Sequence, residues 1–247
     1  MNSLLHIEDL HGGYTHKNVL HGISFDVFPN EIVGLIGLNG AGKSTTIKHV
    51  IGMMQAKKGK VAINGTTFDE NPEGYRQQLA YIPEVPILYD ELTLHEHLRL
   101  TAMAYNIPED TFKKRLDPLL KEFRLSKKLN WFPVHFSKGM RQKVMIMCAF
   151  LIEPELYIVD EPFVGLDPLG IKSYLELMEE MKNNGAGILM STHILATAEK
   201  YCNRFVILHD GHIRAMGTLE ELRESFDRPQ ASLDDIYIQL TKEDADD

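Results

Sequence analysis

The sequence predicts an α/β fold that combines a mixed sheet, a small antiparallel β subdomain and an inserted α-helical subdomain. Short apolar segments at Glu31–Ile36 and Leu156–Asp160 are each followed by helical periodicity, as when strands and helices alternate along a chain. Residues 4–9 and 22–28 show partial apolar–polar alternation instead, which is typical of half-buried antiparallel strands. Residues 86–153 carry mainly helical patterns, so we expect them to form a helical insertion between strands.

Composition places the chain among ordinary globular proteins. Its 247 residues are 44% hydrophobic and 25% charged, and the net charge of -9 argues against general affinity for nucleic acid. Cys148 and Cys202 lack C-x-x-C spacing, which argues against a zinc site or a disulfide framework and fits a reducing compartment. The N-terminus does not resemble a signal peptide. The longest apolar run, Val144–Ile152, is far short of the about 20 residues that span a bilayer, so another chain would supply any membrane part.

Charge is unevenly distributed along the chain. Residues 86–150 contain eleven Lys or Arg and seven Asp or Glu, whereas residues 227–247 contain seven acids and two bases. The basic surplus indicates a separate partner for the helical segment, but a solvated helical face would have the same composition. We expect three units: an α/β core at residues 1–85 and 154–226, a helical subdomain at 86–153 and an acidic tail at 227–247.

The segment Gly37–Ser44 reads G-x-x-x-x-G-K-S, the phosphate-binding loop of nucleoside triphosphatases. Its glycines let the backbone N–H groups converge on phosphate oxygens, Lys43 reaches the β- and γ-phosphates, and the Ser44 hydroxyl is placed to bind Mg²⁺. A strand precedes the loop, and the helix after it favours an anion at its N-terminus. The sequence therefore predicts a P-loop NTPase core of the RecA-like type, with nucleotide bound by Gly37, Leu38, Asn39, Gly40, Ala41, Gly42, Lys43 and Ser44.

The other elements follow from local patterns. A turn at Gly12–Tyr14 carries an aromatic residue, and further strands are expected at 60–63, 79–82, 188–191, 205–208 and 213–216. Helices are expected after the loop from Ser44 to Met53, from Thr93, from Pro108 to about Phe123 with Pro118 as a candidate break, from an N-cap at Ser137, and at 168–182, 194–202 and 218–225. In the tail, Leu233–Leu240 is compatible with a short helix on the core or a contact with a partner, and equally with a solubilising tail.

Two further strand ends carry candidate catalytic residues. Leu156–Asp160 is an apolar strand that ends in Asp160 and is followed by Glu161. In a P-loop enzyme the first acid is placed to hold Mg²⁺ through water, and the second can accept a proton from the attacking water. His193 follows the strand at 188–191 at the edge where ligands bind in such sheets, so it is a candidate sensor of the γ-phosphate.

A second candidate anion site opens the helix after Phe136. Ser137, Lys138 and Gly139 stand at its N-terminus and Met140 follows them. The alternative is an ordinary N-cap with a basic first turn.

With these motifs assembled in this order, the sequence resembles an ATP-binding subunit of an ABC transporter over about residues 3–225. The resemblance implies that Tyr14 stacks on adenine, that the Walker A loop includes Thr45, and that Asp160 and Glu161 are the Walker B acid and catalytic glutamate. It also implies that His193 is the switch histidine. The segment Val164–Asp167, with Asp167 at its end, corresponds to the D-loop, and the family signature L-S-G-G-Q falls on Phe136–Met140.

The resemblance further implies ATP as the bound nucleotide and Mg²⁺ held by Ser44, by Glu84 and, through water, by Asp160. Two copies would sandwich two ATP molecules, with Ser137, Lys138, Gly139 and Met140 acting on the other copy's Walker A loop. We expect hydrolysis through Glu161, His193 and Lys43, and a separate permease at the cytoplasmic face of a membrane, which the chain meets as a peripheral subunit. The sequence at Tyr81–Glu84 and at His135–Lys143 is similar to that of an exporter branch of the family.

The sequence departs from the family pattern at two places. Lys138 and Met140 replace a glycine and a glutamine of the signature. Glu84 stands where the family has a glutamine, which bears on the coupling of ATP hydrolysis to the transmembrane partner. Two other classes of nucleotide-binding protein share parts of this pattern. A soluble ABC-type ATPase acting on ribosomes or nucleic acid usually has two cassettes or long coiled coils, and this chain has one P-loop, no heptad run and a negative net charge, so no nucleic-acid partner is expected. A GTPase or small-molecule kinase would be a different enzyme, but the chain has no N-K-x-D guanine motif.

Overall fold

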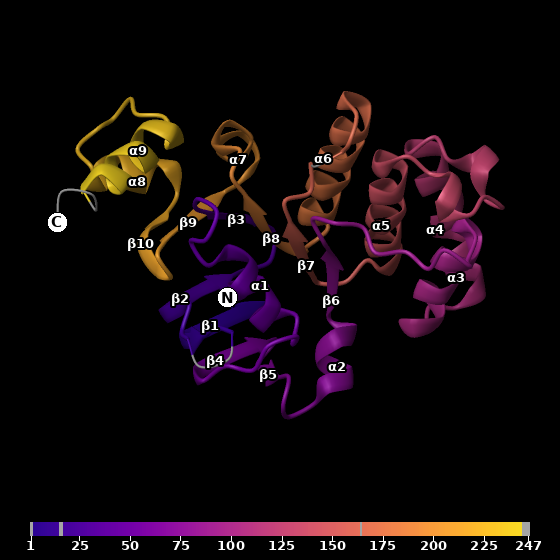
Figure 1. Ribbon diagram of the computed structural model, residues 1–247, viewed down its shortest axis with the longest axis horizontal. Coiled ribbons are helices and arrows are strands. Elements are labelled where there is room, and N and C mark those ends of the chain that lie inside the picture. Colours follow the sequence, from indigo (N-terminus) through magenta and orange to yellow (C-terminus); the bar gives the residue numbers. More distant parts are fainter. Residues whose placement is uncertain (1, 15–16, 164, 244–247) are drawn as a thin grey trace.

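The computed structural model describes residues 2–14, 17–163 and 165–243, whose strands form two sheets (Figure 1). The antiparallel sheet has the order β2-β1-β4-β5 and is built from β1 (Leu5–Gly12), β2 (Leu20–Val27), β4 (Lys58–Ile63) and β5 (Thr66–Thr67). The six-stranded sheet has the order β10-β9-β3-β8-β7-β6 and is built from β3 (Ile32–Ile36), β6 (Leu79–Ile82), β7 (Leu156–Asp160), β8 (Gly187–Thr192), β9 (Arg204–His209) and β10 (His212–Gly217). Its strands run parallel from β9 to β6, and β10 pairs antiparallel with β9 at the edge. The predicted mixed sheet with a small antiparallel subdomain is confirmed.

Helices occupy both ends of the long axis of the molecule. The described residues contain α1 (Lys43–Val50), α2 (Pro72–Gln77), α3 (Leu94–Ala104), α4 (Glu109–Glu122), α5 (Lys138–Ile152), α6 (Pro168–Asn183), α7 (Leu195–Tyr201), α8 (Leu219–Ser225) and α9 (Leu233–Glu243). Helices α3 to α5 follow β6 in the chain and lie together at one end, whereas α8 and α9 lie at the other (Figure 1). Short 3-10 turns at Ser126–Lys128 and Pro133–His135 join α4 to α5.

The helix starts follow from local chemistry, and the interior of α4 corrects one expectation. Thr93 caps α3 in a capping box, and the Ser137 side chain accepts the Met140 N–H at 3.2 Å as the N-cap of α5, as predicted. Pro118 does not break α4: the proline is exposed, and Phe112, Leu116 and Leu119 on the other face pack into the core, which holds the helix together although proline removes one backbone hydrogen bond. Helix α2 has only six residues, so its periodicity was too short to predict; it begins at Pro72 after an Asn71 cap.

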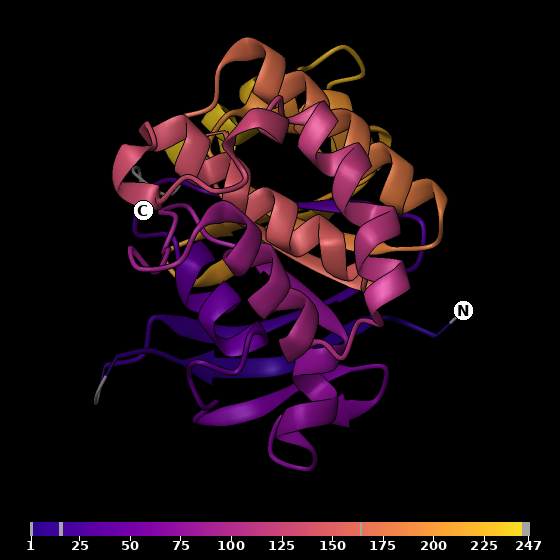
Figure 2. The same cartoon turned by 90° about the vertical axis from the view of Figure 1, so that its right-hand side faces the viewer.

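The helical segment shares its hydrophobic core with the large sheet. One cluster of buried side chains joins Leu98, Phe112 and Val144 to Val159 of β7 and Tyr174 of α6. A second cluster fills the space between the two sheets, and Figure 2 shows the antiparallel sheet, indigo to purple, beneath the helices. Because α5 contacts α3 and α4 as well as β6 and α6, its N-terminus is held at a fixed place relative to the strands. The exact unit boundaries at residues 85, 153 and 226 stay a prediction.

Part of the acidic tail is folded onto the core. Leu233, Ile236 and Tyr237 of α9 join a buried cluster that includes Ile36 and Phe205. Of the three alternatives for the tail, the structure therefore shows the short helix packed on the core, over residues 233–243. The tail residues 244–247 and Val164 of the predicted D-loop lie outside the described residues.

Cys148 and Cys202 are free, and burial raises the pKa of the Cys148 thiol to about 11, so its reactive thiolate form is scarce near neutral pH. Among the described helices, none is long and apolar enough to cross a bilayer.

Candidate functional site: a nucleotide cleft at the sheet edge

Three parallel strands bring the predicted catalytic segments to one edge of the large sheet. β3 and β8 are in register with Ile36 opposite Thr192, and β7 and β8 with Asp160 opposite Ser191. The residues that follow these strands therefore leave the sheet side by side. This is the carboxyl edge, where α/β sheets bind their ligands.

A cleft of about 460 Å³ lies at this edge. Its lining includes most of the predicted nucleotide-binding residues together with one that was not predicted, Val19: Tyr14, Val19, Leu38, Asn39, Gly40, Gly42, Lys43, Ser44, Thr45, Glu84, Glu161 and His193. Gly37 and Ala41 are buried within the loop behind this surface, and Asp160 is buried at the end of β7. The fold thus gathers residues from positions 14 to 193 around one loop.

The Walker-type loop holds its lysine inside the chain. Lys43 is 6% exposed, and its Nζ donates to the carbonyl oxygen of Gly37 at 2.7 Å and lies 3.8 Å from Glu161 Oε1. An ammonium has three donors, so this arrangement leaves capacity for phosphate oxygens. Gly42 has φ of 112°, a conformation that disfavours side chains, and no side chain caps α1 after it. The N–H groups at the start of α1 are therefore left for an anion.

Glu161 and His193 form a pair. Their contact joins Glu161 Oε2 to His193 Nδ1 at 2.8 Å, an orientation in which the ring nitrogen donates when it carries the proton. Glu161 is buried and has φ of 46°, which is uncommon for a residue with a side chain and is typical of functional positions. The His193 side chain is 54% exposed and so can reach a ligand in the cleft while it contacts the carboxylate.

Asp160 is a buried carboxylate in a polar setting. Ser191 Oγ donates to its Oδ1 at 2.5 Å. Burial raises the pKa of Asp160, the Ser191 hydrogen bond opposes that rise, and the neighbouring Glu161 charge adds to it. A nearby cation would favour its ionised form.

The donor set fits Mg²⁺. Ser44 and Glu84 line the cleft, and the Ser44 hydroxyl also interacts with the Asp160 carboxylate, so hydroxyl and carboxylate oxygens meet at one place. In the described part of the chain, no three His, Cys, Asp or Glu side chains form a metal cage. Mg²⁺ needs none, because it binds nucleotide phosphates and water with one or two protein ligands.

Tyr14 stands at the open side of the cleft. Its ring is half exposed, its hydroxyl accepts a hydrogen bond from Lys48 Nζ at 2.8 Å, and the same ammonium lies 5.1 Å from the ring centre. The Lys48 hydrogen bond lowers the pKa of the Tyr14 phenol. The exposed face leaves room for a planar base, the role predicted for it.

The signature segment, Ser137–Met140, does not line the cleft. It forms the exposed start of α5, packed against the residues before α6. A methyl group on Gly139 would lie 2.4 Å from the carbonyl oxygen of Gly165, and one on Gly165 would lie 3.3 Å from Cγ of Lys138. The position of the signature is therefore set by the backbone of the predicted D-loop.

Asp167 ties the two segments more firmly. Its carboxylate caps α6 by accepting the Gly170 N–H at 2.6 Å, and it also accepts a hydrogen bond from Lys143 Nζ of α5 at 3.0 Å. The Gly170 N–H first, and then Lys143, lower the pKa of Asp167. The carboxylate stays ionised and couples the two helices.

Comparisons with known proteins agree with this geometry. The family model described as ABC transporter matches residues 20–164. The chain is 66% identical to the ABC-type transporter ATP-binding protein EcsA of Bacillus subtilis (strain 168), over 98% of each chain. The chain belongs to the ABC transporter family.

Two further members extend this likeness. The chain is 31% identical to the lipopolysaccharide export system ATP-binding protein LptB of Haemophilus influenzae, over 89% of this chain and 92% of that one. A solved structure titled as the ATP binding subunit of an ABC transporter is 61% identical and superposes with a TM-score of 0.95, covering 97% of this chain and all of the other. As an ABC transporter ATP-binding subunit, the chain binds ATP and is an ATPase, as the sequence predicted.

Several side chains that support the site in this ABC subunit escaped the sequence reasoning. Ser191, Lys143, Gln142 and Tyr237 all contact predicted site segments. Gln142 is fully buried on α5, and its Nε2 donates to the carbonyl oxygen of Pro83, next to Glu84, at 3.2 Å. Neither contact could be predicted, because the burial of Gln142 depends on how α5 packs and the Ser191 contact depends on a strand register that the sequence does not give.

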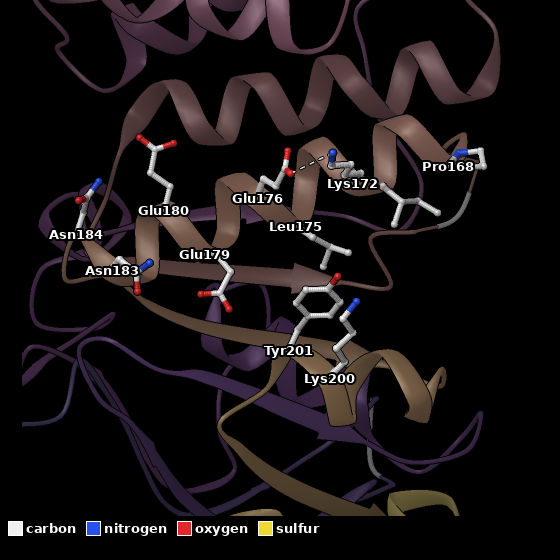
Figure 3. Close-up of a pocket in the computed structure, with 11 residues that line it drawn as sticks. Pro168, Lys172, Leu175, Glu176, Glu179, Glu180, Asn183, Asn184, Lys200 and Tyr201 are labelled. Carbon is white, nitrogen blue, oxygen red and sulfur yellow. Dashed lines mark ion pairs between the residues drawn. The ribbon is translucent and has the colours of Figure 1, made fainter.

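A larger hollow of about 760 Å³ lies elsewhere, between α6 and α7 (Figure 3). Its lining carries Glu176, Glu179 and Glu180, and Lys172 forms an ion pair with Glu176 along the same helix at 3.5 Å. It has neither a glycine loop nor a strand-end acid. Its carboxylates would repel a triphosphate, so we assign the ATP site to the smaller cleft.

Proposed function

We propose that this ATPase subunit works as a homodimer that closes on two ATP molecules and drives a separate export permease. The observation that carries the proposal is the separation of the signature segment, Ser137–Met140, from the cleft of its own chain. A second copy facing the first would place its exposed signature against the bound phosphates. Each chain would then contribute half of every active site.

In the proposed reaction, a water molecule attacks the γ-phosphate in line with the leaving oxygen. Glu161 orients this water and accepts its proton, and His193 holds the Glu161 carboxylate while its exposed edge faces the phosphate. Lys43 stabilises the charge that develops on the phosphate oxygens. Ser44, Glu84 and, through water, Asp160 would hold Mg²⁺, which supplies charge neutralisation on the β- and γ-phosphates when it is bound.

The permease would dock on an apolar surface of the helical segment. Val85, Ile87 and Tyr89 from the loop after β6, and Trp131 and Val134 from the turns before α5, are exposed large side chains. Exposed apolar groups that gather on one face indicate an interaction site.

Polar contacts hold these two loops together. Arg141 donates to Asp90 and to the carbonyl oxygen of Pro133, both at 3.3 Å, and the Leu94 N–H donates to the carbonyl oxygen of Trp131 at 3.0 Å. Docking here would place the subunit at the cytoplasmic face of a membrane. Export is the favoured direction because the relative LptB is named for export and because the sequence around Tyr81–Glu84 and His135–Lys143 is similar to an exporter branch of the family.

The dimer and the catalytic base are tested together by Glu161→Gln. Glutamine keeps the size and the hydrogen bond to His193 but cannot take a proton, so turnover should fall at least a hundredfold while MgATP yields a stable dimer in size-exclusion chromatography with light scattering. Normal hydrolysis by this variant would refute the base assignment, and a monomer at saturating MgATP would refute the dimer.

The transport role is tested by purifying the tagged full-length chain from membranes. A multi-span protein should co-purify, and Ile87→Glu with Val134→Glu should release it without changing nucleotide binding. Recovery of ribosomes or RNA in place of the multi-span protein would support a soluble ABC-type ATPase that acts on ribosomes or nucleic acid, and would contradict the transport role.

A further inference from the structure

A side chain from the C-terminal helix reaches the phosphate-binding loop. The hydroxyl oxygen of Tyr237 in α9 accepts the backbone N–H of Leu38 at 2.8 Å, across 199 positions of sequence. The carbonyl of the same peptide unit, that of Gly37, accepts the hydrogen bond from Lys43 Nζ at 2.7 Å. The Gly37–Leu38 peptide is therefore held from both sides, by Tyr237 on its N–H and by Lys43 on its C=O.

Packing fixes the phenol in this position. Tyr237 is 7% exposed and lies in a buried cluster with Ile36, the residue immediately before the loop, and with Leu233 and Ile236 of the same helix. The Leu233 N–H donates to Glu199 Oε2 of α7 at 2.7 Å, which holds the first turn of α9. The hydroxyl is thus presented by a rigid element and not by a loose tail.

We propose that Tyr237 is a positioning residue for ATP binding: it fixes the orientation of the Gly37–Leu38 peptide and, through that peptide, the place of the Lys43 ammonium. The proposal rests on the assignment of the nucleotide site to the P-loop cleft. A peptide unit that can rotate would take its carbonyl away from Lys43. Only a fraction of empty molecules would then be ready to bind, and the apparent affinity would fall by that fraction.

The size of the effect follows from the kind of bond. Burial raises the pKa of Tyr237, so the phenol is neutral and the bond joins two uncharged groups. Bonds of this kind contribute enough to change an equilibrium by roughly three- to tenfold. Once ATP is bound, its phosphates hold Lys43 and the loop directly, so we expect Kd and KM to rise while kcat is unchanged.

The test compares Tyr237→Phe with Tyr105→Phe in the full-length chain. Phenylalanine keeps the ring in the core and removes only the hydroxyl. Tyr105 is a matched control, because its hydroxyl also bonds one backbone group, the carbonyl oxygen of Leu79 at 3.0 Å, away from the cleft. Titration calorimetry with MgADP and MgATP and steady-state hydrolysis should show a three- to tenfold rise in Kd and KM for Tyr237→Phe alone.

Amide hydrogen exchange supplies a readout that a general loss of stability would not mimic. The Leu38 amide should exchange faster in Tyr237→Phe than in Tyr105→Phe, while amides in β7 and β8 keep their protection. If Tyr237→Phe binds MgADP as tightly as Tyr105→Phe, the positioning role is wrong. A fall in kcat at unchanged KM would also overturn it. Lys43→Ala separates the two claims: if it also binds MgADP normally, the nucleotide site itself is misassigned.

Discussion

The P-loop and the signature segment each lie at the N-terminus of a helix, but the two N-termini differ in their capping, burial and surroundings. Helix α1 has no side-chain cap, its lysine is buried and donates to the Gly37 carbonyl oxygen with donor capacity to spare, and its N–H groups face a cleft walled by four other segments. Helix α5 is capped by its own Ser137, and Lys138 is exposed at its first position. The first N-terminus is prepared for a ligand within its own chain. The second is a rigid, outward-facing piece whose position is set by Gly165 and Asp167.

The largest expected difference between the two regions is in nucleotide affinity. Lys43→Ala removes a buried cation that is predicted to make charge-assisted bonds to phosphate, so MgADP affinity should fall about a hundredfold. Lys138→Ala removes an exposed cation outside the cleft and should leave the affinity of the isolated chain within about twofold. Titration calorimetry on both variants checks this, and equal losses would remove the distinction between the two N-termini.

A second test mixes chains that are defective in opposite halves. Gly139→Ala puts a methyl group 2.4 Å from the Gly165 oxygen, so the start of α5 must move; turnover should fall at least tenfold with MgADP affinity retained. An equal mixture of Gly139→Ala and Lys43→Ala chains forms heterodimers with one intact composite site. Random pairing predicts about a quarter of the unmodified activity. No recovery on mixing would contradict sites shared between chains.

The buried charge of Asp160 beside the nucleotide cleft should also lower the stability of the fold. Burial raises the pKa of Asp160 above its ordinary value of 3.8. Protonation of Asp160 therefore adds to the free energy of unfolding. This contribution is complete below the ordinary pKa and is lost as pH rises through the higher pKa of the folded state. At pH 7, Asp160→Asn should raise Tm by about 2–4 °C, since asparagine can still accept from Ser191 without a charge.

Calorimetric scans between pH 3 and pH 8 check this prediction. The gain of Asp160→Asn should disappear below about pH 4. A gain that is the same at every pH would mean that burial of the charge is not its cause.

The smallest expected effect concerns the cap of α5. Ser137→Ala should cost about 1 kcal/mol of stability, the usual value of an N-cap, and Thr93→Ala in α3 is a control that loses an N-cap bond of the same type and also the Thr93 hydroxyl bond to Glu96. Both should lower Tm in thermal unfolding, Thr93→Ala by the larger amount. Only Ser137→Ala should also slow ATP hydrolysis, by a few-fold, because its hydroxyl would face the partner's phosphate. Equal hydrolysis rates in the two variants would make Ser137 a helix cap alone.

Much of this protein could be predicted from its sequence because the determining interactions are local. A glycine loop between an apolar strand and a helix predicts a phosphate site, since both the backbone conformation and the exposed N–H groups arise within Gly37–Ser44. The two acids at the end of β7, Asp160 and Glu161, and the N-cap at Ser137 are equally local. These features placed most of the candidate cleft residues, although their individual roles stay predictions.

Only the tertiary structure decided which distant groups meet. The bond from Ser191 to Asp160 depends on the register of β7 with β8, and the bond from Gln142 to the Pro83 carbonyl oxygen depends on how α5 packs. The packing of α9 on the core depends on an apolar cluster that includes Ile36. Strand register and helix packing are set by the whole core rather than by any short segment. For that reason the sequence identified the P-loop from eight residues, while the contact of Tyr237 with Leu38 emerged only from the fold.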